Sequence, residues 1–201
     1  WAALSSGLDN ESPWAVAFEE DGLARRLSVL SENAGRPHPA LLEDLWLNAE
    51  RRAANGLYDD AIARLYRLAE AAVQTRLWMN HGIDAGHVPE ARIPGGLLSR
   101  LKPSRDRRTG RHVYELSLAQ ARWLLSDMAP DDPVAASLGR QPDWQRNRNA
   151  SILAHGFVPM GEPSWRAARN WFRQRRGILW EDILGRPTEC QLPDRMPEAP
   201  Q

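Results

Sequence analysis

The chain has 201 residues, as many acidic as basic side chains, and a single cysteine. A chain of this length can bury enough apolar surface to fold without a disulfide or a metal ion. Cys190 alone excludes an internal disulfide and a cysteine-based zinc site, which favours a reducing, cytoplasmic setting. The zero net charge argues against a nucleic-acid binder that is held by bulk positive charge alone.

The apolar runs of the sequence are far shorter than the roughly 18 residues that a membrane span needs. No basic-then-apolar leader opens the chain, so we expect no membrane association. The sequence begins at Trp1 rather than at methionine. This start is compatible with a fragment of a longer polypeptide, in which a regulatory domain precedes Trp1.

The first half of the chain is predicted to contain a helical hairpin. Residues 1–40 mix turn-forming residues with one short apolar pattern, which indicates a lead-in with a small helix. Apolar residues at helical spacing follow over 41–53, and Asn55-Gly56 is a typical helix stop. A longer helix is predicted over 58–80. Two alanine-rich helices joined by a short turn can pack closely, which favours an all-α helical bundle.

The middle of the chain is predicted to be irregular before helices resume. Glycine and proline occur throughout 82–116, which indicates a long insertion, and 112–116 has the pattern of a short strand. Ser117 and Gln120 have the spacing of a capping box, which predicts the start of a helix. Pro130 ends that helix.

Two more helices are predicted in the last third of the chain. After a short helical turn over 134–138, Pro142 suits the first position of a helix that reaches His155 and ends at Gly156. A further helical region begins at Pro163.

No strand-helix alternation and no glycine-rich phosphate loop is present in the sequence, which excludes a nucleotide-binding α/β domain. The predicted fold class is therefore an all-α helical bundle with an irregular insertion around 82–116 that holds a short β segment. We divide the chain into a lead-in or linker over 1–40, a helical domain over 41–185 and a disordered tail over 186–201.

Arg148 and His155 lie seven positions apart within the helix that is predicted over 142–155. Spacing alone is weak support, because roughly 0.6 arginine-histidine pairs are expected by chance at any one separation. On a helix, however, seven positions turn through about 700°, which places both side chains on one stripe, about 10.5 Å apart along the axis. A phosphodiester fits between two such side chains.

Two other arginine-histidine pairs lack a suitable scaffold. Arg76 and His81 are five positions apart, about 500° around a helix, and therefore lie on largely opposed faces. Arg105 and His112 are seven positions apart, but Gly110 lies between them and no helix fixes their geometry.

Histidine and arginine suit the cleavage of RNA without a metal ion. The reaction needs a 2′-hydroxyl to be deprotonated, a 5′-oxygen to be protonated and a phosphorane to be stabilised. One histidine cannot easily be both acid and base, whereas a homodimer with two motif helices across a twofold axis supplies two copies of His155 and Arg148. Supporting candidates near the pair are polar or aromatic: Asn147, Asn149, Ser151 and Trp144.

The string Arg-Asn-x-Ser-Ile-x-Ala-His-Gly-Phe, residues 148–157, resembles the catalytic segment of HEPN domains in the CRISPR-associated CARF-HEPN ribonucleases of type III systems. Residues 48–53 and 58–67 are similar to the long-helix region of that family. The resemblance implies a HEPN-like fold and a homodimeric antiviral endoribonuclease that cleaves single-stranded RNA and needs no metal or other cofactor. It also implies activation by cyclic oligoadenylate, bound by a CARF domain that this chain lacks.

Other interpretations of these residues stay open. His155 also suits a C-terminal cap, whose ring binds the last carbonyls of the helix. Asn147, Asn149 and Ser151 fit an ordinary helix surface, and Trp144 fits a buried anchor for the helix as well as it fits the wall of an RNA cleft. The whole chain could be a non-catalytic HEPN-like helical module that dimerises or binds a nucleotide or RNA.

For the acids, histidines and tryptophans elsewhere in the chain, we expect structural roles. The acids Asp59-Asp60 and Asp131-Asp132 are expected at helix starts, where the helix dipole favours them. His81 and His87, with Asp84 between them, lack a third well-placed ligand, so we expect no metal site. Five tryptophans fall in apolar helical patterns and are expected in the core: Trp46, Trp123, Trp165, Trp171 and Trp180.

Two segments are conspicuously rich in arginine, 92–111 and 166–176. A guanidinium group can bind phosphate through two hydrogen bonds, so both segments are candidates for contacts with nucleic acid. A solvated helix or loop surface explains any single one of these arginines equally well.

Overall fold

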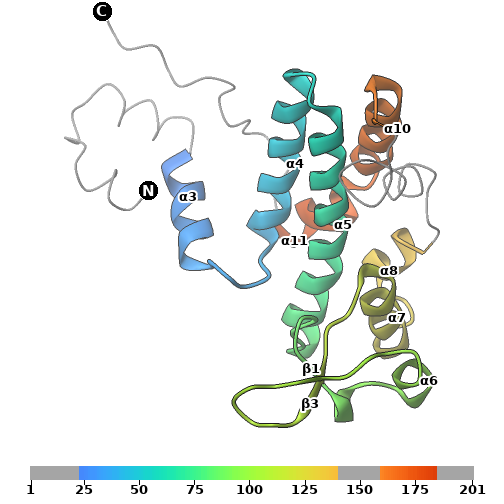
Figure 1. The fold of residues 1–201 in the computed structure, drawn as a ribbon. Helices are drawn as coiled ribbons and strands as arrows, with labels where there is room; N and C mark the ends of the chain where they lie inside the picture. Colours follow the sequence, from blue (N-terminus) through green and yellow to red (C-terminus); the bar gives the residue numbers. More distant parts are fainter. Residues whose placement is uncertain (1–22, 140–158, 185–201) are drawn as a thin grey trace, which may run out of the picture.

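The computed structural model describes residues 23–139 and 159–184, with side chains from residue 28 onward. Within these ranges the fold is a set of packed helices with one small sheet at one end (Figure 1). The predicted all-α class with a short β segment in an insertion is confirmed. The helix predicted over 142–155 lies outside the described residues. The division of the chain into domains stays a prediction.

Two long antiparallel helices, α4 (Pro39–Ala54) and α5 (Tyr58–His81), form the centre of the fold (Figure 1). A shorter helix, α3 (Leu23–Glu32), precedes them and contacts α4. The predicted helical hairpin is therefore confirmed. None of the described helices is both long and apolar enough to cross a membrane.

Local sequence explains where α4 and α5 begin and end. Gly56, with φ of 74°, follows α4, and Gly82, with φ of 62°, caps α5 in the left-handed conformation that glycine adopts without strain. α4 begins two residues earlier than predicted. The reason is a cap that the sequence pattern did not reveal, because the Nδ1 atom of His38 accepts a hydrogen bond from the Ala40 N–H at 3.2 Å.

The core is densest where α4 and α5 face each other. Ala49, Ala61 and Ala72 are inaccessible to solvent, and their small side chains allow the two helix backbones to approach closely. Larger apolar side chains on the same two helices are also fully buried: Leu42, Ile62, Leu65, Leu68 and Leu77. Each such side chain contributes about 1.5–3 kcal/mol to folding, so the hairpin is the main stabilising unit of the fold.

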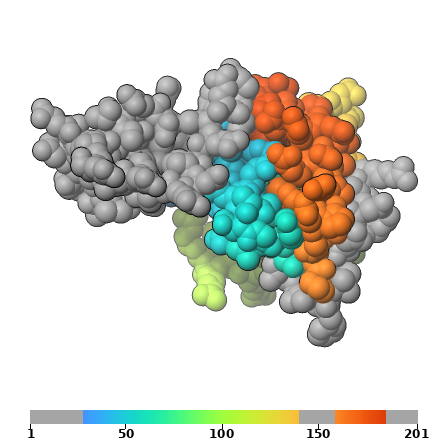
Figure 2. All heavy atoms as spheres, turned by 90° about the horizontal axis from the view of Figure 1, so that it is seen from above, coloured from blue at the N-terminus to red at the C-terminus, as the bar shows by residue number. Residues whose placement is uncertain are grey.

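Shorter helices cover the hairpin. Three of them contact α5: α7 (Leu118–Met128), α8 (Pro133–Ser137) and α10 (Glu162–Arg173). Figure 2, a view from the end at which α4 and α5 are joined, shows α10 directly against the hairpin. The chain then returns to α4 through a π-helical turn, η2 (Gly177–Glu181), and α11 (Asp182–Leu184). The fully buried Trp180 on η2 lies 5.7 Å from Trp46 between ring centroids.

A three-stranded antiparallel sheet lies near the C-terminal end of α5 (Figure 1). Its strands are β1 (Val88–Pro89), β2 (Ser104–Arg105) and β3 (His112–Tyr114), in the order β1-β3-β2. A 3-10 turn, η1 (Glu90–Arg92), and α6 (Gly95–Leu98) lie between β1 and β2 in the chain. β3 confirms the predicted strand. β1 and β2 were not predicted, because two residues are too few to carry a strand pattern.

The expectation for the tryptophans is right for four of the five and wrong for Trp123. Trp46, Trp165 and Trp180 are buried, and Trp171 packs against the core while half-buried. Trp123 is 41% exposed. The buried stripe of α7 includes Ala121, and a residue two positions later lies about 200° away around the helix. Trp123 therefore points to solvent, where the Arg100 guanidinium lies 5.0 Å from its ring centroid.

Candidate functional site

The residues that are predicted from the sequence to be catalytic or to bind substrate lie outside the described residues, so their assignment stays a prediction. This applies to the pair Arg148 and His155 and to every supporting candidate: Asn147, Asn149, Ser151 and Trp144. The structure does describe the residues on both sides of the segment 140–158, and these are informative.

The C-terminal side of the segment is attached to the first turn of α5. The backbone N–H of Met160 donates a hydrogen bond to Oδ1 of Asp59 at 3.0 Å, and Met160 is buried. Asp59 lies in the first turn of α5, as its expected role at a helix start requires. It also fixes the position of Met160 against the hairpin.

The N-terminal side is attached near the other end of α5. Oδ1 of Asp132 accepts hydrogen bonds from the N–H groups of Val134 at 2.9 Å and Ala135 at 3.1 Å, which caps α8. Oδ2 of the same carboxylate lies 3.0 Å from Nε and 2.9 Å from Nη2 of Arg76 on α5. The expected helix-start role of Asp132 is confirmed, and one described residue on each side of the segment, Asp132 and Met160, binds a side chain of α5.

The same ion pair bears on the alternative pair Arg76 and His81. The Arg76 guanidinium is bound to Asp132, a nearly fully buried carboxylate. The Nε2 atom of His81 is buried without a hydrogen-bond partner among the described residues. Arg76 therefore has a structural partner of its own at the start of α8, and its guanidinium group is not directed to a site shared with His81 by any described contact.

Arg105 and His112, the other alternative, have a fixed geometry after all. They are directly opposite each other in the β2-β3 pairing, so the pairing of two strands, rather than a helix, fixes their relative position. Nδ1 of His112 lies 3.6 Å from the Glu90 carboxylate, and that carboxylate also accepts a hydrogen bond from the Tyr114 hydroxyl at 3.3 Å. His112 therefore belongs to a polar cluster with Glu90 and Tyr114.

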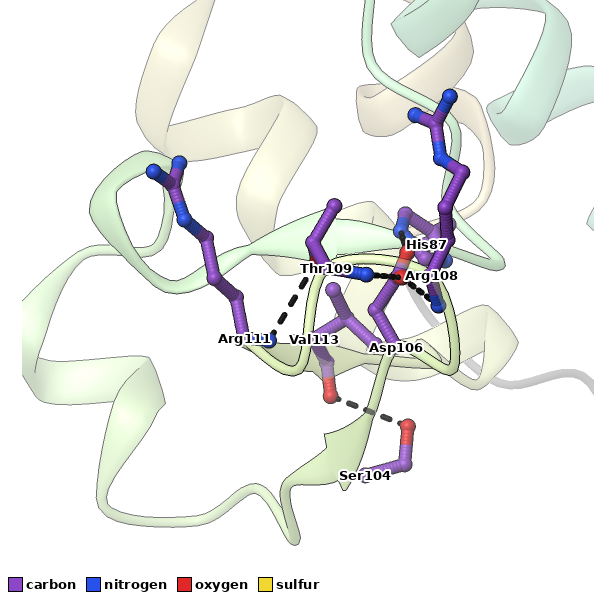
Figure 3. Close-up of polar contacts among 7 residues, drawn as sticks. All are labelled: His87, Ser104, Asp106, Arg108, Thr109, Arg111 and Val113. Atoms are coloured by element: carbon purple, nitrogen blue, oxygen red, sulfur yellow. Dashed lines mark hydrogen bonds and ion pairs between the residues drawn. The ribbon is translucent and has the colours of Figure 1, made fainter.

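The turn between β2 and β3 is ordered by one carboxylate, that of Asp106. Its Oδ1 accepts hydrogen bonds from the N–H groups of Arg108 and Thr109, each at 2.7 Å, and its Oδ2 lies 2.7 Å from Nε2 of His87 (Figure 3). The hydrogen bond from the Thr109 N–H is the main reason why the pKa of Asp106 is lowered. The sequence pattern did not reveal this turn, although an aspartate shortly before Thr109-Gly110 is typical of turns.

His81, Asp84 and His87 do not come together as ligands of one metal ion. His87 faces Asp106, and the Asp84 carboxylate accepts a hydrogen bond from the N–H of Gly86 at 2.9 Å. No group of three or more histidine, cysteine, aspartate or glutamate side chains in the described ranges could hold a metal ion.

The two arginine-rich segments differ in their contacts. In 166–176, Nε of Arg169 lies 2.7 and 3.0 Å from the two carboxylate oxygens of Glu50 on α4. Arg166 pairs with Glu162, and the Arg175 guanidinium lies 4.1 Å from the centroid of the Trp171 ring. In 92–111, by contrast, four exposed arginines form no ion pair with a described residue: Arg105, Arg107, Arg108 and Arg111.

Comparison with known families identifies the chain. The family model described as the Csm6 HEPN domain matches residues 31–175, a range that extends from α3 to the end of α10 and includes the predicted motif. No curated protein and no solved structure matches the chain. Because the match covers most of the sequence and the described fold is all-α, the chain belongs to the Csm6 HEPN domain family of CRISPR-associated proteins.

Proposed function

We propose that this chain is an endoribonuclease domain that cleaves single-stranded RNA without a metal ion. The observation that carries the proposal is the Csm6 HEPN match, because its range includes the predicted pair Arg148 and His155. In addition, Asp132 and Met160, which lie on either side of 140–158 in the sequence, both bind side chains of α5.

The proposed reaction divides the work between two protomers. One His155 removes the proton from a 2′-hydroxyl, which attacks the adjacent phosphorus, and the other His155 protonates the departing 5′-oxygen. Arg148 stabilises the charge of the phosphorane. The products are a 2′,3′-cyclic phosphate and a 5′-hydroxyl. The homodimer follows from this scheme, because a single protomer has one histidine for two proton transfers.

We assign secondary roles to the neighbours of the pair. Asn149, Asn147 and Ser151 are proposed to bind phosphate oxygens or to orient Arg148, and Trp144 is proposed to line the RNA cleft. These residues are expected to alter substrate affinity more than the rate of the chemical step.

Regulation is proposed to come from a CARF domain that is not among residues 1–201. In this scheme a CARF domain binds cyclic oligoadenylate and activates the ribonuclease during type III CRISPR antiviral defence. The family match supports a CRISPR setting for the chain, and the activating ligand is part of the proposal.

Cleavage of a labelled single-stranded RNA by the full-length polypeptide, with cyclic oligoadenylate present, tests the proposal. His155→Ala and Arg148→Ala are each expected to lower the cleavage rate by about 100-fold or more, because each removes a group that acts in the transition state. His38→Asn is the matched control, since asparagine keeps a side chain that can cap α4. A metal chelator is expected to leave the rate unchanged.

The oligomeric state separates the enzyme from a non-catalytic module. Sedimentation of the variants is expected to give the same dimer as the unsubstituted protein, so lost cleavage reports on chemistry. A dimeric protein that leaves RNA intact with every cyclic oligoadenylate would instead identify a helical dimerisation or binding module. Full activity of His155→Ala would remove the proposed role of this residue.

A further inference from the structure

The hairpin of β2 and β3, residues 104–114, concentrates positive charge on a chain that is neutral overall. From Arg100 to Arg111 the sequence contains six cationic side chains and one acid, Asp106. Arg105, Arg107, Arg108 and Arg111 are all exposed. We call residues 104–114 the basic hairpin.

The single acid of the basic hairpin does not neutralise these arginines. Both oxygens of Asp106 are engaged, one by the N–H groups of Arg108 and Thr109 and the other by His87. Figure 3 shows the guanidinium groups of Arg108 and Arg111 extending away from Asp106 on either side of Thr109. Neither guanidinium group has an ion pair with a described residue. Among the described residues, nothing neutralises these two guanidinium groups, which leaves their charge open to a ligand.

The backbone of the basic hairpin is held in a defined shape. β3 pairs with β2 on one side and with β1 on the other, and the Ser104 hydroxyl donates to the Val113 carbonyl at 3.2 Å (Figure 3). The turn is closed by the hydrogen bond from the Gly110 N–H to the Asp106 carbonyl at 2.9 Å. A shaped backbone presents the arginines together, which lowers the entropy lost when they bind a ligand with repeated negative charges.

We propose that the basic hairpin binds the phosphates of single-stranded RNA through arginines that are not part of the predicted motif. This inference rests on the proposed function, which makes RNA the substrate, and it adds an RNA-binding surface to that function. Arginine suits this task because its planar group donates two hydrogen bonds to one phosphate and keeps its charge at every physiological pH. Backbone phosphates give affinity without base preference.

Binding of a 2′-O-methylated RNA oligonucleotide tests the proposal independently of catalysis, because this RNA lacks the nucleophile for cleavage. The variant Arg107→Ala/Arg108→Ala/Arg111→Ala is expected to weaken binding by about tenfold at low salt, measured by fluorescence anisotropy with the full-length protein. Each lost phosphate contact is expected to reduce the slope of log affinity against log salt by about 0.7, and three contacts by about 2.

A matched control removes the same charge elsewhere. Arg52→Ala/Arg166→Ala/Arg169→Ala takes away three arginines that are ion-paired within the fold, and its salt slope is expected to stay within about 0.5 of the unsubstituted protein. Lysine at positions 107, 108 and 111 is expected to restore most of the slope, because the charge returns. Equal thermal unfolding of the alanine variant and the unsubstituted protein verifies that the hairpin variant is folded.

The outcomes separate this inference from the proposed function. If the hairpin variant binds RNA with unchanged affinity and salt slope, the inference is overturned even when the protein cleaves RNA. It is also overturned if both triple variants lose affinity equally, since overall charge then explains the effect. If hairpin-dependent binding is found but no RNA is cleaved, the inference stands and the proposed catalysis fails.

Discussion

The arginines of α10 and those of the basic hairpin are alike in chemistry but differ in their surroundings. Arg169 binds both oxygens of Glu50 on α4, and Arg166 pairs with Glu162 one turn earlier on its own helix. The basic hairpin has one acid, Asp106, which is engaged by His87 and by backbone N–H groups. The role of an arginine is thus decided by the carboxylates that the fold brings within reach.

The two regions also differ in what their charges do for stability. An arginine on α10 connects helices, because its partner Glu50 is 119 positions away in the sequence. The arginines of the basic hairpin form no ion pair with a described residue, so they lack this source of stability. We propose RNA phosphate as the ligand of these unpaired charges.

The largest expected effect concerns Arg76, whose ion-pair partner is a buried carboxylate. Arg76→Ala is expected to lower the free energy of unfolding by about 3 kcal/mol, because the buried Asp132 carboxylate loses its partner. Urea unfolding followed by circular dichroism measures the change. Arg108→Ala is the control and is expected to change the unfolding free energy by less than about 0.5 kcal/mol. Similar losses of unfolding free energy in Arg76→Ala and Arg108→Ala would contradict the distinction between ion-paired and unpaired arginines.

An intermediate effect is expected for Arg169, whose ion pair with Glu50 is only partly shielded. The side chains are 38% and 28% exposed, so solvent screens the attraction and Arg169→Ala is expected to cost about 1 kcal/mol. A double-mutant cycle with Glu50→Ala measures the coupling between the two side chains. The coupling is expected to weaken in high salt, and a coupling of zero would place Arg169 with the unpaired arginines.

The smallest expected effect is the pH response of the basic hairpin. Because the fold lowers the pKa of Asp106, its carboxylate stabilises the turn at pH values above the usual aspartate range near 4, and this stabilisation is lost as the pH falls through the lowered pKa. The NMR signal of the Thr109 amide is expected to shift over that acidic interval. In Asp106→Asn the group does not titrate, so a shift that persists in this variant would point to another cause.

Local sequence determined the helical hairpin and the motif assignment. Gly56 and Gly82 adopt a positive φ where α4 and α5 end. This conformation depends only on the absence of a side chain at that position, so local sequence is enough to predict it. The choice of Arg148 and His155 likewise came from one predicted helix stripe and a resemblance, and it stays a prediction. The exposure of Trp123 also follows from local sequence, because Trp123 lies on the opposite face of α7 from the buried Ala121. The prediction that Trp123 is in the core was wrong because an apolar residue within a helix is not always on its buried face.

The tertiary structure alone decided which charged groups have partners. Arg76 meets Asp132 across 56 positions, and Arg169 meets Glu50 across 119, because helices far apart in the sequence pack side by side. β1 and β2 exist only through their pairing with β3. Short-range patterns encode where helices begin and end, whereas ion pairs and short strands depend on contacts that no local pattern contains.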